Sequence, residues 1–93
     1  MTQISVERKH NLGREGARQK AQQVVEKLEQ RYDVQATWDG DTIVVKRSGA
    51  NGTVQIDDDS IRIELKLGMM LSMMSGTIQG EIEKALDKAL ARA

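Results

Sequence analysis

Residues 34–67, VQATWDGDTIVVKRSGANGTVQIDDDSIRIELKL, decide the fold of this 93-residue chain. Apolar and polar residues alternate along the stretch, which is typical of β-strands with one buried face. Three turn signals interrupt the alternation, and they are Asp39-Gly40, Gly49-Ala50-Asn51-Gly52 and Asp57-Asp58-Asp59-Ser60. The pattern therefore predicts four short antiparallel strands joined by three hairpins.

The turns also predict how the strands pair. The expected closing pairs are Trp38 with Asp41, Ser48 with Thr53, and Ile56 with Ile61. All three registers place the apolar side chains on one face of the sheet, and a slip by one residue would turn every side chain over. The opposite face is expected to meet water, and it carries Thr37, Lys46, Gln55, Arg62, Glu64 and Lys66.

The flanking segments supply one more strand and two helices. Ile4 and Val6 alternate with polar residues and predict a short strand, and apolar residues at steps of three and four predict a helix over about 14–31. A last helix is expected over about 69–91. Its first half should fray or kink, because Gly76 and Gly80 each cost about 1 kcal/mol relative to alanine inside a helix.

The resulting order, β-α-β-β-β-β-α, predicts a single α+β domain over residues 1–93. It is a two-layer sandwich of a five-stranded antiparallel sheet with both helices on its one apolar face. With the first strand beside the last, the strand order is 1-5-4-3-2. This topology resembles half of a TATA-binding-protein-like (TBP-like) fold, or a short helix-grip domain of the kind found in lipid-transfer proteins.

The composition excludes several classes of function. Fourteen Lys and Arg residues balance fourteen Asp and Glu residues, so no nucleic-acid partner is expected. The chain has no cysteine, which excludes disulfides, thiol nucleophiles and zinc–thiolate sites. The N-terminal residues lack the apolar run of a signal peptide, and the longest uncharged stretch, 67–80, is too short to span a bilayer. We therefore expect a cytoplasmic protein with no transmembrane segment.

Few residues are candidates for catalysis or metal binding. His10 is the sole histidine, and no neighbouring residue is spaced to orient it as a general base. Asp57-Asp58-Asp59 lacks the alternating ligands and the final glutamate of a calcium loop, so a solvated hairpin turn is expected there. The glycines form no phosphate-binding motif. We expect no catalytic residue, no cofactor and no metal.

Methionine is concentrated in one place. The chain has no phenylalanine and one tryptophan, and four of its five methionines fall within residues 69–74. On one interpretation, Met70 and Met74 join Leu71 and Ile78 on the helix stripe that faces the sheet, where methionine fills irregular gaps. On the other, the segment is an apolar interaction patch for a partner, a hydrophobic ligand or a lipid-like surface. The candidate patch comprises Leu67, Met69, Met70, Leu71, Met73 and Met74.

Three short motifs resemble those of the small polyhydroxyalkanoic acid system proteins of bacteria, and the resemblance covers nearly the whole chain. The motifs are His10-x-Leu12-Gly13 before the alanine-rich helix, Trp38-x-Gly40, and Arg47-Ser48-Gly49 followed by Gly52. The resemblance implies a bacterial intracellular protein that associates with polyester storage granules or with their regulation. It brings no catalytic residues with it.

The leading hypothesis is a non-enzymatic accessory or binding protein of the polyhydroxyalkanoate storage system, localised at the granule surface. Its candidate patch would contact the polyester granule surface or a granule-associated protein. The alternative is a small carrier that holds a hydrophobic or acyl ligand between the sheet and the last helix. Homodimerisation has two candidate surfaces, the exposed edge at 34–38 and the methionine segment, because an unprotected strand edge is a template for pairing.

Overall fold

The computed structural model describes residues 2–91. Its elements are β1 (Thr2–Lys9), α1 (Gly13–Tyr32), β2 (Gln35–Asp39), β3 (Thr42–Arg47), β4 (Ala50–Ile56), β5 (Ser60–Leu67), α2 (Met69–Ser72) and α3 (Ser75–Ala91). The strands form one antiparallel sheet in the order β1-β5-β4-β3-β2. The predicted α+β class, element order and strand order are confirmed.

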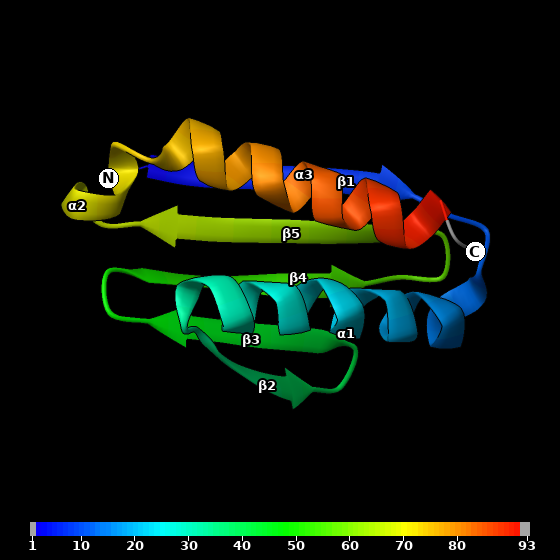
Figure 1. Cartoon of the computed structure of the whole chain (residues 1–93). Helices are drawn as coiled ribbons and strands as arrows, with labels where there is room; N and C mark the ends of the chain where they lie inside the picture. The colour runs from blue at the N-terminus through cyan, green and yellow to red at the C-terminus, as the bar shows by residue number, and fades with distance from the viewer. Residues whose placement is uncertain (1, 92–93) are drawn as a thin grey trace.

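Both long helices cover the same face of the sheet and run in opposite directions across it (Figure 1). The core lies between these two layers. Its fully buried members come from all parts of the chain, and they include Ile4, Val24, Val25, Ile43, Val54, Ile61, Ile82 and Leu86. The alternation in the strands and the three-to-four spacing in the helices therefore converge on one apolar layer.

The third hairpin has the predicted register, with Ile56 opposite Ile61. The first does not, since the closing pair is Asp39 with Thr42 and the turn is shifted to Gly40 and Asp41. Gly40 has φ 63° while Asp41 does not have a positive φ, which is the pattern of a type II′ turn rather than the expected type I′.

The second hairpin closes on Arg47 with Ala50, and its turn is Ser48-Gly49 rather than the predicted four-residue loop. Gly49 takes the positive φ of 84° that the turn requires, while Gly52 lies inside β4. Both errors in register shift the pairing by an even number of residues, so every side chain stays on its predicted face. The buried face of the sheet was therefore predicted correctly, although two hairpins are out of register.

The expected last helix is divided into α2 and α3. The break falls at Met73 and Met74, within the first half of the expected helix as predicted, but the two glycines do not mark it, because Gly76 and Gly80 lie within α3. There the backbone N–H of Met74 bonds to the carbonyl of Leu71, three residues back, instead of continuing the α-helical ladder. The direction of the chain changes at this point, from the end of β5 to the line of α3 (Figure 1).

Polar contacts tie the helices to the sheet. The Trp38 indole N–H donates to Gln22 at 2.8 Å, and the Arg18 guanidinium lies 4.3 Å from the centre of the Trp38 ring. A buried or half-buried indole N–H usually has a hydrogen-bond partner, and Gln22 is that partner here. On the other helix, the Arg8 guanidinium of β1 meets Asp87 of α3 at 2.8 Å, and this hydrogen bond raises the pKa of Arg8 above its ordinary value.

We predict that Gly52→Ala destabilises the fold. A Cβ at this position would overlap the carbonyl oxygen of Glu64 and lie 2.9 Å from the Cα of Leu65. Overpacking of this kind lowers the free energy of unfolding by about 1–3 kcal/mol, which urea denaturation would measure. The matched control is Gly80→Ala, where nothing lies within 4 Å and removal of a helix glycine should raise stability by up to about 1 kcal/mol. Equal stabilities for the two variants would contradict the close packing of β4 on β5.

Candidate functional site

The methionine segment lies at one end of the molecule, beyond the last residue of β5 (Figure 1). Backbone hydrogen bonds hold it there. The N–H of Gly68 donates to the carbonyl of Gly49 at 2.7 Å, which joins the end of β5 to the turn between β3 and β4. Both the N–H and the hydroxyl of Ser72 donate to the carbonyl of Gly68, at 3.0 and 2.9 Å. The position of α2 is thus set by its backbone and one serine.

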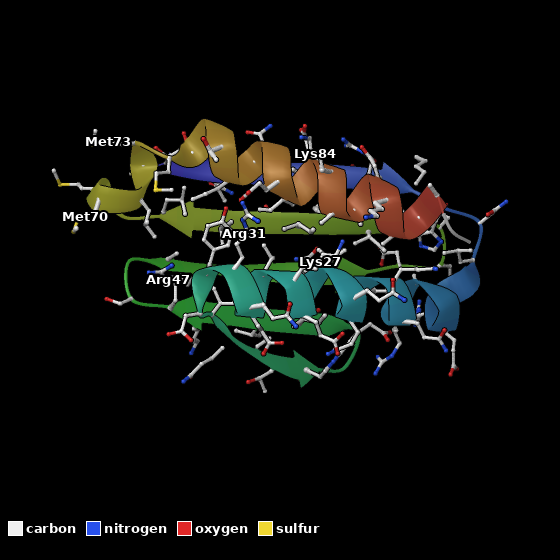
Figure 2. All side chains as sticks on the ribbon, viewed as in Figure 1. Lys27, Arg31, Arg47, Met70, Met73 and Lys84 are labelled. Carbon is white, nitrogen blue, oxygen red and sulfur yellow. The ribbon has the colours of Figure 1, made fainter. Side chains whose placement is uncertain are left out.

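The methionine side chains point away from this anchored backbone. The exposed fractions are 83% for Met69, 88% for Met70, 91% for Met73 and 45% for Met74. We call these four residues the Met patch. They are the large hydrophobic residues that residues 2–91 leave exposed, and Figure 2 shows Met70 and Met73 projecting from the end of the molecule.

The two leucines of the candidate patch, unlike the methionines, pack against the core. Leu67 is buried in the core, and Leu71 is half-buried against it. The interpretation that placed Met70 and Met74 on the core stripe with Leu71 is wrong for Met70, which is almost fully exposed, and Met74 is exposed as well. The break between α2 and α3 is the reason, because it ends the helical phase that would have turned these residues toward the sheet. The structure therefore separates an apolar anchor from an exposed apolar surface.

An apolar hollow lies beneath this end of the fold. Its lining includes Leu28 and Tyr32 of α1, Leu71 of α2 and Ile78 of α3. Its volume is about 30 Å³, close to the share of one molecule in liquid water. Drug-sized ligands occupy pockets of about 300–1,000 Å³. This hollow is therefore too small for an acyl chain.

His10 and the aspartate run support the loops at the opposite end of the sheet. The Nδ1 atom of His10 accepts from the backbone N–H of Leu12 at 3.1 Å, and its Nε2 atom lies 3.2 Å from the carbonyl oxygen of Asp57. One neutral tautomer satisfies both contacts, so the ring is engaged in connecting two loops. Asp58 pairs with Arg14 at 3.2 Å. These contacts show that His10 and the aspartate run stabilise the turns at this end of the sheet.

Sequence reasoning missed a groove between α1 and α3, because its walls come from helices far apart in the chain. The Lys27 and Arg31 pair on α1 and the Lys84 and Lys88 pair on α3 line it. The sequence did contain a signal for the groove, because each helix carries two cations four residues apart, which places them on one helix face.

These features define a small two-layer α+β domain whose exposed large apolar side chains, within residues 2–91, lie on one segment at the end of the molecule, residues 69–74. The chain belongs to the family described as "Putative polyhydroxyalkanoic acid system protein", whose model matches residues 4–90. The comparisons with curated proteins and with solved structures found no match. None of the helices within residues 2–91 is long and apolar enough to cross a membrane.

We predict that the exposed methionines contribute nothing measurable to folding. Met70→Ser and Met73→Ser should change the free energy of unfolding by less than about 0.5 kcal/mol, as exposed substitutions do. Leu71→Ser should lower it by about 1 kcal/mol or more, because it removes a side chain packed on the core. Urea denaturation of the three variants tests the distinction. A methionine variant as unstable as the leucine variant would show that the Met patch is part of the core.

Proposed function

We propose that the chain is a non-enzymatic accessory protein of the polyhydroxyalkanoate system that binds the polyester surface of the storage granule through the Met patch. The observation that carries this proposal is the exposure of four methionines on one short segment, while the other large apolar side chains of residues 2–91 are buried or partly buried. A contiguous exposed apolar surface of this kind marks an interaction site. The family supplies the polyester system as the setting.

The charge pattern favours an uncharged surface as the partner. Residues 67–80 contain no charged side chain, so the segment that carries the Met patch offers no group of its own to pair with a lipid phosphate or an acidic protein. Arg47 lines the hollow beside Leu71, and its guanidinium donates to the carbonyl of Tyr32. A polyhydroxyalkanoate surface presents alkyl groups and ester carbonyls and carries no charge. The patch is also convex, because it projects from the end of the molecule (Figure 2). A projecting apolar surface can enter a soft polymer surface without a preformed pocket.

Methionine suits such a contact. Its unbranched thioether side chain adapts to irregular surroundings, which is why promiscuous binding surfaces use it. Each methionine that becomes fully buried stabilises the bound state by about 1.5–3 kcal/mol. Several together support reversible association with a granule in the cytoplasm. The alternative of an internal acyl carrier has no comparable support, given the volume of about 30 Å³ between the helices and the sheet.

We predict that replacing Met69, Met70 and Met73 together by serine weakens binding to polyester at least about tenfold, because the apolar contact is lost. The measurement is co-sedimentation of the purified protein with protein-free poly(3-hydroxybutyrate) particles. The matched control replaces the same three residues by leucine, which keeps the apolar surface and should keep the binding.

Two outcomes would overturn the proposal. In the first, the serine variant binds the particles as well as the original chain does. In the second, the original chain does not bind protein-free particles and sediments only with granules that retain their protein coat. This result would identify a protein partner instead. Circular dichroism of the serine variant shows that any loss of binding is not a loss of fold.

A further inference from the structure

A groove follows the solvent side of the contact between α1 and α3, away from the Met patch. It consists of two hollows of about 330 and 620 Å³ that share Lys27, Gln30, Ala85 and Lys88 in their linings. Val24 and Leu28 of α1 line it together with Ala85 and Ala89 of α3, which makes part of the groove apolar. Its volume is large enough for a small organic ligand.

Positive charge is concentrated in this groove, although the whole chain is neutral. Lys27 and Arg31 come from α1, and Lys84 and Lys88 come from α3. Figure 2 shows Arg31 reaching across the gap toward α3, with Lys27 further along the same gap. Like charges four residues apart destabilise a helix, and here both helices carry such a pair on the walls of one groove. A bound anion would relieve this repulsion.

Two carboxylates line the groove and only partly balance the cations. Glu81 forms an ion pair with Arg31 at 2.6 Å, and Glu26 accepts a hydrogen bond from Gln22 at 3.3 Å. None of Lys27, Lys84 and Lys88 forms an ion pair with a carboxylate within 4.0 Å among residues 2–91. Three ammonium groups from two helices are therefore free to bind an anion.

Glu81 places a second requirement on a ligand of the groove. Its Oε1 atom meets Arg31, whereas its Oε2 atom is buried and has no hydrogen-bond partner within the described part of the chain. A buried acceptor without a donor destabilises the protein by about 1–3 kcal/mol, or more when it is charged. A ligand that satisfies this atom must supply a donor close to its anionic group.

We propose that the groove between α1 and α3 binds a small hydroxycarboxylate. Lys27 and Lys84 bind the carboxylate, the Glu81 carboxylate turns toward the ligand so that its Oε2 atom accepts a hydrogen bond from the hydroxyl, and the short alkyl part lies on Leu28 and Ala85. The two sources of such a carboxylate are the free hydroxy acid and the carboxyl end of an oligoester. The site favours the free acid, because ester formation removes the hydroxyl donor. This binding site is independent of the granule contact at the Met patch.

The test is an NMR titration of the full chain with 3-hydroxybutyrate, with butyrate and with the ester dimer of 3-hydroxybutyrate. The expected result is amide shifts along the groove and an affinity for 3-hydroxybutyrate at least about tenfold above that for the other two, because a hydrogen bond to a charged group is at stake. Equal affinities for all three ligands, or shifts confined to other regions, would overturn the proposal.

Variants separate the roles of the groove residues. Lys27→Gln with Lys84→Gln should abolish binding, whereas Lys9→Gln with Lys20→Gln removes the same charge outside the groove and should retain it. Glu81→Gln should remove the preference for the hydroxy acid without weakening the binding of butyrate. Equal losses in the two lysine pairs, or an unchanged preference in the Glu81 variant, would contradict the assignment. None of these ligands requires polyester particles, so the outcome does not depend on the granule experiment.

Discussion

One-sided burial of the sheet is the constraint on which the rest of the structure depends. The five strands have one apolar face, and two helices on that face are needed to cover it. After β5 the chain must therefore leave the end of the sheet, rise by the thickness of one layer and return along α3. Residues 68–74 make this corner. Only Leu71 reaches back to the core, and the methionines around it are left outside.

The same constraint explains how much the sequence could predict. The alternation of apolar and polar residues determines which face of each strand is buried. Three short turns with a consistent apolar face predicted the four-stranded part of the sheet, and the flanking segments, with the first strand placed beside the last, completed the element order and the strand order. Registers depend on which residue takes the positive φ in each turn. Both Gly49 and Gly52 were available for the second turn, and the choice depends on Gly52 packing tightly against Leu65 in the neighbouring strand. Such a contact is a property of the assembled sheet.

The sequence predicted where the candidate site lies but not which of its side chains are buried and which are exposed. The density of methionine marked residues 69–74, but helical periodicity assigned Met70 and Met74 to the core stripe. That assignment assumes one continuous helix, and the break at Met73 and Met74 invalidates it. The two residues at the break, Met73 and Met74, are neither proline nor glycine, so the sequence carries no helix-breaking residue at that position. At this corner α2 is held at the end of the sheet by the hydrogen bond from Gly68 to Gly49 and by the packing of Leu71 on the core.

Charge is organised by the same geometry. Arg14 and Arg18 of α1 both pair with Asp41 in the first hairpin turn, and Arg8 of β1 pairs with Asp87 of α3, so these pairs join helix to sheet. Exposed pairs contribute at most about 1 kcal/mol each, and their value here is in fixing how the layers meet. The cations between α1 and α3 form no ion pair with the sheet among residues 2–91, and the pair of Arg31 with Glu81 joins the two helices within one layer. Charges that hold elements together need partners within the protein, whereas charges that gather without such partners on facing helices are suited to a partner from outside.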